Sequence, residues 1–277
     1  MSFLFIKQGL EFLTPIGVAF GRCSMGALTL VLISKSRGVQ LSKDLKIWGH
    51  LFVVALLLNV IPGILFALAE TKVTSILAGI INAVTPLMTV VAILLIGREE
   101  QPKRSQLIGL LVGFTGVATV MGIWNGLGDN PIAYVLLLLL AVSCYGFSFP
   151  YARRFVLPYK LEPTEMATMQ LLCAAAVLLP GFLIDGIAKD NYQPIPLISM
   201  LCLGVFGSGF AYIWNFQIIK EAGSAIASSV TYVTPVVAVI AGIIFLGESI
   251  TWYEPVGALI VLFGAAIAQE RIKINRL

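Results

Sequence analysis

The amino-acid sequence predicts an all-α integral membrane protein built from two inverted five-helix repeats. Three observations predict this fold class: a strongly apolar composition, an internal repeat around two Thr-Pro segments, and basic residues confined to alternate linkers. The chain has 277 residues, of which 58% are hydrophobic and 12% charged, and its mean hydropathy is +0.96. A soluble protein would carry about a quarter charged residues. The apolar segments are expected to be helices, because a lipid-exposed backbone must satisfy its own hydrogen bonds.

Apolar segments long enough to cross a bilayer follow one another along the chain. A short apolar piece at 2–6 comes first, and the linkers between the later segments are short, which favours antiparallel neighbours. Nine spans are expected, at residues 15–34, 47–69, 75–96, 106–124, 132–152, 164–184, 196–217, 224–246 and 253–269.

The segment Ser75–Ile96 recurs at Ser224–Phe245, which indicates an internal repeat. Both copies contain a Thr-Pro pair, and both place small and hydroxyl residues at helical spacing. Since proline frees a carbonyl one turn earlier, each copy is expected to be interrupted, with Pro86 and Pro235 as hinges. A polar stripe in such a helix is expected to face the bundle interior or a water-filled cavity.

The repeat extends over the chain and divides it into residues 1–129 and 130–277. The second copy opens with a complete helix, whereas little sequence precedes Pro15 in the first copy. The intact pattern is therefore ten transmembrane helices, five plus five, of which the first is truncated here by about 18 residues. We expect that the natural start lies upstream of Met1.

Basic residues lie on alternate linkers, and their placement predicts the orientation of the chain. Of the 18 Lys and Arg residues, 14 fall on one side: after the second, fourth, sixth and eighth helices and after the tenth. This distribution predicts that both termini are cytoplasmic. An odd number of helices per repeat then inserts the two halves in opposite orientations, as in many secondary transporters.

The ordered set of motifs in both halves resembles the EamA branch of the drug/metabolite transporter superfamily. The resemblance is carried by Ser2–Lys7, by Arg22, and by two Thr-Pro helices, each followed by a Gly-Glu-type turn (Gly97–Glu100 and Gly247–Glu248) and a Gly-rich helix. It implies a multi-pass transporter of the bacterial inner membrane that moves a small polar or amphipathic metabolite, such as an amino acid, outward. Because both repeat helices are broken at the same depth, we expect alternating access around a site between the halves.

The candidate substrate-binding residues are polar or aromatic side chains of the central helices. Asn59 of the first half lies at the place equivalent to Ser208 of the second, one helical turn before Tyr212, and Asn82 lies in a broken helix. The alternative is that these groups only bond across helices, each contributing about 0.6 kcal/mol. The full set is Arg22, Asn59, Asn82, Tyr145, Tyr212, Trp214, Asn215, Thr231 and Tyr232.

Arg22 is the only charge well inside a complete span, seven residues from its start. Placing Arg near mid-membrane costs about 2.5–3.5 kcal/mol, so such a residue is usually paired or functional. No carboxylate of a complete span lies deeper than the span ends, so Arg22 has two remaining roles. It either reaches the interface or helix-end carbonyls, or it binds an anionic group of the substrate. Together with Lys7, it favours a carboxylate.

Nothing in the sequence supports catalysis. The cysteines lie in apolar runs without metal-type spacing, there is a single histidine, and no carboxylate pair or phosphate loop is present. We therefore expect no enzyme, no cofactor and no metal. Because the complete spans contain no Asp, Glu or His deeper than their ends, we expect facilitated export or exchange, or coupling through groups that the sequence does not identify. The alternatives are an intramembrane enzyme, which would need a titratable cluster, a channel, which would favour rings of like residues, or a non-transporting membrane protein.

The expected partners are a small-molecule substrate and the lipid bilayer. Nucleic acid is not expected, because the net charge of +4 follows from the linker distribution of basic residues. Glycines of the last helix in each repeat suit close helix packing or the surface of a homodimer. They are Gly109, Gly113, Gly116, Gly257 and Gly264.

Overall fold

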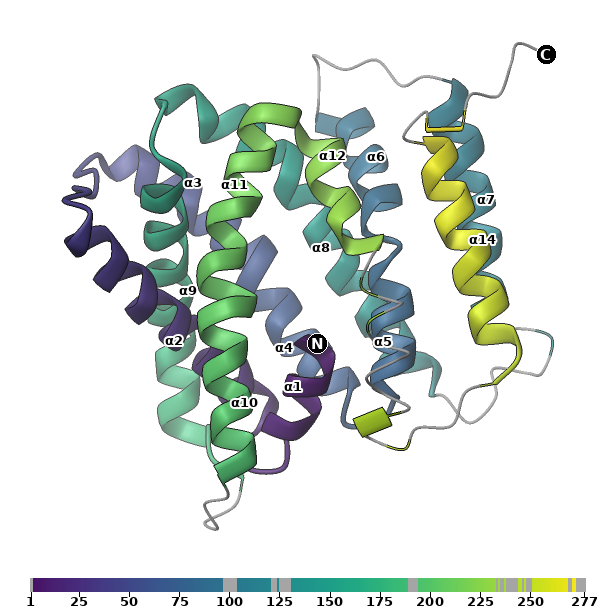
Figure 1. Ribbon diagram of the computed structural model, residues 1–277, viewed down its shortest axis with the longest axis horizontal. Coiled ribbons are helices and arrows are strands. Elements are labelled where there is room, and N and C mark those ends of the chain that lie inside the picture. The colour runs from purple at the N-terminus through teal and green to yellow at the C-terminus, as the bar shows by residue number, and fades with distance from the viewer. Residues whose placement is uncertain are drawn as a thin grey trace.

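The computed structural model describes residues 2–96, 104–120, 124, 131–188, 194–232, 234, 237, 244–245, 247, 251–268 and 271–272. Within these residues the chain is all-helical, and the only extended pairing is an isolated bridge between Leu13 and Ile187. Figure 1 shows the helices as one bundle, with α7 and α14 together at one side and α2, α9, α10 and α11 at the other. The turn Gly97–Glu100, Pro235 and the side chain of Tyr232 lie outside the described residues.

The helices of residues 2–120 follow the expected spans closely, with breaks inside two of them. A π-helical segment, η1, separates α3 from α4, and a two-residue turn separates α5 from α6. The bounds are α1 Ser2–Gly9, α2 Pro15–Ser36, α3 Leu45–Ala55, η1 Leu56–Val60, α4 Ile61–Ala69, α5 Ser75–Asn82, α6 Thr85–Ile96 and α7 Arg104–Val120.

The helices of residues 131–268 repeat this pattern, including a second π-helical segment, η4, between α10 and α11. The bounds are α8 Ile132–Phe155, η3 Leu157–Tyr159, α9 Pro163–Asp185, α10 Pro194–Gly204, η4 Val205–Phe210, α11 Ala211–Ala222, α12 Ser224–Ser228, η5 Ser229–Tyr232 and α14 Tyr253–Ala268.

Six helical stretches are long and apolar enough to cross a membrane, which supports the predicted membrane protein. Two further helices, α7 and α14, have 17 and 16 residues. The arrangement as ten helices in two inverted repeats, divided at residue 129, stays a prediction. The six stretches are Pro15–Ser36, Leu45–Ala69, Ser75–Ile96, Ile132–Tyr159, Pro163–Asp185 and Pro196–Ala222.

Helix starts follow local capping signals in the sequence. The Thr14 side chain accepts a hydrogen bond from the Gly17 amide at 3.2 Å, and proline occupies the first position of α2. Asp44 caps α3 through the Lys46 amide at 2.8 Å, and Thr74 caps α5 through the Leu77 amide at 3.1 Å. These side chains satisfy amides that have no partner within the helix, and proline loses nothing there because it has no N–H.

The first Thr-Pro helix is interrupted, as its sequence predicts, and the described part of the second changes its helix type before the pair. In the first copy α5 ends at Asn82, residues 83–84 form a turn, and α6 begins at Thr85. In the second copy α12 gives way to the 3₁₀ segment η5 just before the Thr-Pro pair. Whether Pro86 and Pro235 act as hinges between two states stays a prediction.

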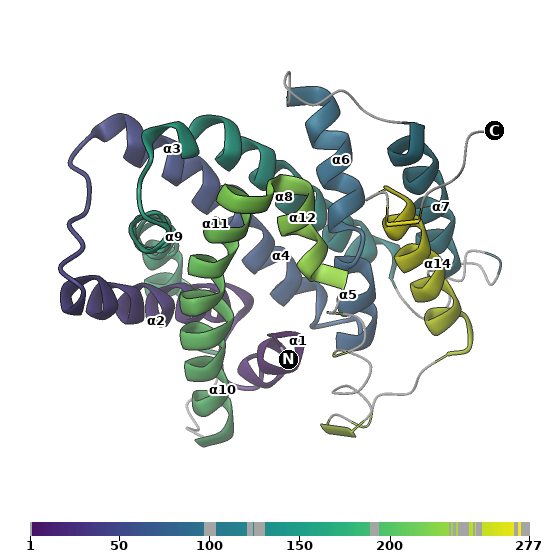
Figure 2. The same ribbon diagram turned by 45° about the horizontal axis from the view of Figure 1, so that its top comes forward.

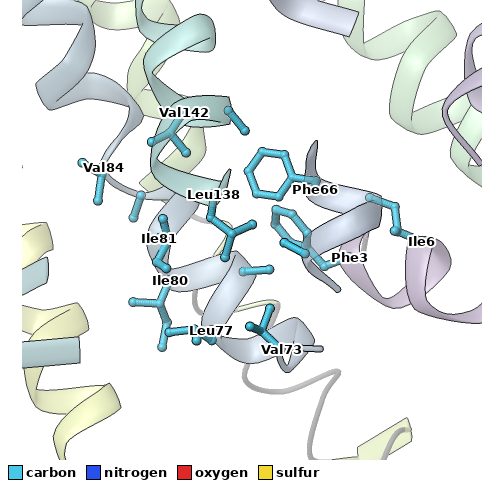
Figure 3. Packing of buried hydrophobic residues seen from close by; sticks show 14 of the residues in the cluster. Phe3, Ile6, Phe66, Val73, Leu77, Ile80, Ile81, Val84, Leu138 and Val142 are labelled. Atoms are coloured by element: carbon cyan, nitrogen blue, oxygen red, sulfur yellow. The ribbon is translucent and has the colours of Figure 1, made fainter. Parts of the chain in front are cut away.

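The core between the two halves is apolar and partly aromatic. Phe3 of α1 packs against Phe66 of α4 with ring centroids 5.2 Å apart, and Leu138 of α8 is fully buried in the same cluster (Figure 3). Figure 2 shows α1 beside α10, which it contacts in addition to α5. Elements of the first and second halves therefore interleave instead of forming two separate bodies.

The glycines of α7 and α14 lie where these two helices touch. A Cβ atom at Gly264 would lie 2.5 Å from the Gly113 nitrogen, and one at Gly116 would lie 2.6 Å from the Val261 nitrogen. Such distances leave no room for a side chain, so glycine sets the spacing of the pair. The expected close helix packing is therefore found within the chain, and the homodimer surface stays a prediction.

Candidate functional site

Arg22 lies inside the bundle and joins elements from both halves of the chain. Only 6% of the side chain is exposed. Its Nε atom donates to the Ser208 hydroxyl at 3.3 Å, and its Nη2 atom donates to the Tyr212 hydroxyl at 3.4 Å. Tyr145 of α8 also interacts with the guanidinium. Among the described residues these partners are all uncharged, so the structure gives Arg22 no counter-ion there.

A chain of buried polar groups continues from Arg22 to helix α9. The Tyr212 hydroxyl donates to the carbonyl of Leu58, in the π-helical segment η1, at 3.3 Å. The neighbouring Asn59 is fully buried, and its side-chain oxygen accepts a hydrogen bond from the amide of Gln170. Gln170 is also fully buried, and its own side-chain oxygen has no hydrogen-bond partner in the described structure.

These side chains form one group, which we call the Arg22 cluster. They come from six elements: α2 and η1 of residues 1–129, and α8, α9, η4 and α11 of residues 130–277. The two π-helical segments lie at matching places of the repeat, and π-helical turns occur frequently at functional sites. The cluster consists of Arg22, Asn59, Tyr145, Gln170, Ser208 and Tyr212.

Glycine allows the backbone of α2 to approach α10 closely beside the cluster. A Cβ atom at Gly204 would lie 2.4 Å from the Cβ of Met25 and 3.3 Å from the carbonyl oxygen of Arg22. Gly26 is equally confined, because a Cβ there would lie 3.1 Å from the Gly204 carbonyl oxygen. This close contact places Arg22 within reach of Ser208, which lies one helical turn beyond Gly204.

An aromatic surface adjoins the cluster. The ring of Tyr145 stacks on Phe66 with centroids 5.7 Å apart, and Phe66 in turn packs against Phe3 (Figure 3). The phenol of Tyr145 faces the guanidinium of Arg22, while its ring belongs to this aromatic row. The site therefore combines a positive charge and amide groups with an apolar wall.

A second polar contact joins the two broken helices. Asn82 is 6% exposed, and its side-chain nitrogen lies 3.5 Å from the hydroxyl of Thr234, the threonine of the second Thr-Pro pair. The Thr85 hydroxyl donates to the Asn82 carbonyl at 2.7 Å. Thr231, by contrast, donates to the carbonyl of Ser228 within its own segment at 2.8 Å. Asn82 thus reaches the other half, whereas the hydroxyl of Thr231 is used locally.

Two residues expected at the site have no described bond to the Arg22 cluster. Trp214 is 65% exposed, because it follows the buried Tyr212 by two positions and so lies on the far side of α11. Asn215 is partly buried, with a side-chain oxygen that has no hydrogen-bond partner in the described structure, and no described contact ties it to Arg22.

Lys7 does not share the environment of Arg22. Its Nζ atom donates to the carbonyl oxygens of Glu70 and Val73, at 2.8 and 3.3 Å. These carbonyls lie at the end of α4 and in the turn that follows it, where helices have carbonyls without intrahelical partners. Lys7 and Arg22 therefore have different kinds of partner, and the carboxylate preference that the sequence suggested for both bases stays a prediction.

Gln170 is the cluster member that the sequence analysis did not single out. Its signal was available, because it is an amide inside the otherwise apolar span Pro163–Asp185. The repeat that sets Pro15 over Pro163 also sets Arg22 over Gln170, but only the packing of α9 against η1 shows that Gln170 meets Asn59.

Comparison with known proteins gives the family. The sequence model described as "EamA-like transporter family" matches residues 1–122 and 132–268. The inner membrane transporter YedA of Escherichia coli is 25% identical over 96% of this chain and 85% of its own length. The transporter YvbV of Bacillus subtilis is 24% identical over 98% of this chain and 87% of its own length.

Two further similarities are more limited. A protein of Streptantibioticus cattleyicolor named "Probable terminal-alkyne amino-acid exporter" is 26% identical over 47% of this chain and 42% of its own length. A crystal structure of another protein matches with a TM-score of 0.69 over 100% of this chain and 96% of that one, at 17% identity, which shows the fold alone. Because the family's sequence model matches nearly the whole chain in two parts, this protein belongs to the EamA-like transporter family and is a membrane transporter.

Proposed function

We propose that this protein exports a small metabolite, an amino acid or a related amphipathic compound, by alternating access across a bacterial inner membrane. The observation that carries the proposal is the Arg22 cluster. Charged and polar side chains inside a membrane bundle are costly, so their presence usually marks pairing with another polar group, binding or transport. Here they come from both halves of the chain and meet beside an aromatic surface.

The contact between the broken helices supports the alternating-access part of the proposal. Asn82 and Thr234 lie 3.5 Å apart, each next to an interrupted helix, so a rocking motion of one half against the other would change this contact. Helix breaks near the membrane midplane are typical of transporters whose halves move around a fixed site. In this proposal both termini are cytoplasmic, as the basic linkers predict.

The similarity to an amino-acid exporter favours amino acids as the first compounds to test. That relative covers about half of the chain, so its substrate enters only as a candidate. Reconstituted protein should exchange preloaded radiolabelled amino acids for external ones, in a panel that includes propargylglycine, phenylalanine and leucine. Counterflow above empty liposomes for at least one member is the expected result, and no movement of any panel member would refute the proposal.

A labelling experiment tests the location of the path. A cysteine at Asn82, introduced after removal of the native cysteines, should react with a small polar thiol reagent, and a transported amino acid should slow this reaction. The matched control is a cysteine at Leu140, which is 52% exposed on an apolar helix and is expected to face lipid. Equal labelling of both positions, without protection by substrate, would place the path elsewhere.

A further inference from the structure

The guanidinium of Arg22 holds its uncharged neighbours through weak contacts. The bonds to Ser208 and Tyr212, at 3.3 and 3.4 Å, are longer than ordinary N–H···O hydrogen bonds of 2.7–3.2 Å. A guanidinium has five N–H donors in a planar fork. Even with Tyr145 as a third partner, donors remain for another acceptor.

An anion is the partner that this environment lacks. Hydrogen bonds in which the donor or the acceptor is ionised are roughly twice as strong as bonds between neutral groups, and a carboxylate adds the opposite charge and accepts two parallel N–H bonds from a guanidinium. The described partners of Arg22 carry no negative charge, although 94% of the side chain is shielded from solvent. We propose that Arg22 is the binding residue for a carboxylate group of the transported metabolite, an inference that rests on the proposed transport function.

The surroundings indicate which carboxylates fit. Tyr145 presents its hydroxyl to Arg22 and its ring to Phe66, so an apolar body beside the carboxylate would meet aromatic surface. The class is therefore a small carboxylate with an apolar side chain. Amino acids and simple organic acids share this chemistry, and they differ by the amino group alone.

Binding of a carboxylate at Arg22 would also act on the link between the two halves. The present partners Ser208 and Tyr212 belong to η4 and α11, whereas Arg22 belongs to α2. A carboxylate that takes over the guanidinium releases these hydroxyls, and Tyr212 keeps its bond to the Leu58 carbonyl. The same exchange of partners would thus bind the substrate and weaken the contact of α2 with η4 and α11.

The test compares ligands that differ in one group, bound to the purified full chain in nanodiscs. Pentynoate, propargylglycine and propargylglycine amide form one series, and phenylpropanoate, phenylalanine and phenylalanine amide form a second. Binding is measured by ligand-induced thermal stabilisation. In each series that binds, carboxylates should bind at least about tenfold more tightly than the amide, as expected for a lost charge-assisted bond. Tighter binding of the amino acid than of the simple acid identifies amino acids as the source of the carboxylate, and the reverse identifies organic acids.

Variants assign the preference to one residue. Arg22→Gln should reduce the preference for carboxylates to less than about twofold, and Arg22→Lys should retain part of it because the charge remains without the planar fork. Lys7→Gln is the matched control, since Lys7 binds helix-end carbonyls, and it should keep the full preference. If Arg22→Gln does not fold, the comparison of Arg22→Lys with the wild type carries the test.

Three results would overturn the inference: no carboxylate of either series binds, the amides bind as tightly as the carboxylates, or Arg22 variants keep the wild-type preference. Failure of the proposed function is a separate result. It would show as carboxylate binding that depends on Arg22 without any transport in proteoliposomes. Transport whose carboxylate preference survives Arg22→Gln would refute the role of Arg22 and leave the transport function standing.

Discussion

Replacing Arg22 with methionine is expected to stabilise the protein while it abolishes transport. Methionine has a similar length and no charge, so it removes the cost of keeping an arginine inside a span. That cost is about 2.5–3.5 kcal/mol on insertion scales. The two described hydrogen bonds to Ser208 and Tyr212 return about 0.6 kcal/mol each, an average for bonds between membrane helices. The expected net gain in unfolding free energy is therefore about 1–2 kcal/mol.

The two hydroxyls that lose Arg22 as a partner can still form hydrogen bonds. The Tyr212 hydroxyl still donates to the Leu58 carbonyl, and Ser208 can donate to a carbonyl of the preceding helical turn. Thermal unfolding in detergent, read by intrinsic fluorescence, should show a higher apparent Tm, by about 2–4 °C for each kcal/mol gained. Proteoliposomes with the same variant should show no counterflow of the wild-type substrate.

The opposite stability result would refute this reasoning. A fall in apparent Tm, with unchanged expression and oligomeric state, would mean that Arg22 serves chiefly to hold α2 against η4 and α11. Arg22→Lys is the control, because it keeps the cost of the charge and should gain no stability.

Three further predictions concern the cluster, the helix packing and the energy source. The single variants Asn59→Leu and Gln170→Leu should each destabilise the protein, because each leaves a buried amide without its partner. The double variant should lose less unfolding free energy than the two single variants together, with a coupling energy of about 0.6–1.7 kcal/mol in a double-mutant cycle. Strictly additive losses would contradict the pairing. Gly264→Ala should lower the unfolding free energy by about 1–3 kcal/mol, since the new Cβ would meet the backbone of α7. The control is Gly49→Ala, because Gly49 faces open space in α3. This variant should leave the unfolding free energy unchanged or raise it by up to about 1 kcal/mol. Transport by proteoliposomes should not follow an imposed pH gradient in the absence of an exchangeable solute, because proton coupling usually needs an acid or histidine inside a span. A rate that tracks the gradient would point to an acidic side chain or a histidine outside the Arg22 cluster.

Much of the helical structure could be predicted from local signals in the sequence. Apolar length located the spans, and the first Thr-Pro helix is interrupted as its sequence predicts. Thr14 and Asp44, which cap α2 and α3, are also of the residue types that commonly begin helices. These features are local because a helix in lipid satisfies its backbone hydrogen bonds within itself. The polar residues Arg22, Asn59 and Tyr212 could also be nominated as site candidates, since few polar side chains occur inside the spans.

The sequence could not show which nominated residues meet. Trp214 and Tyr212 were equal candidates, yet one faces outward and the other bonds to Arg22. In a membrane protein the lipid-facing and core-facing sides of a helix are both apolar, so hydrophobic patterning does not separate them as it does in a soluble protein. Lys7 shows the same limit, because its distance to the Glu70 carbonyl depends on how α1 lies against α5.

The sequence by itself determined the membrane setting, the helix breaks and the small set of polar side chains available for a site. Only the tertiary structure decided that Gln170 pairs with Asn59 and that Arg22 has uncharged partners within the described residues. The physical reason is that apolar length and proline act within one helix, whereas a buried polar group is satisfied by whichever helix packs against it. That choice depends on close contacts such as the one at Gly204, which no local pattern encodes.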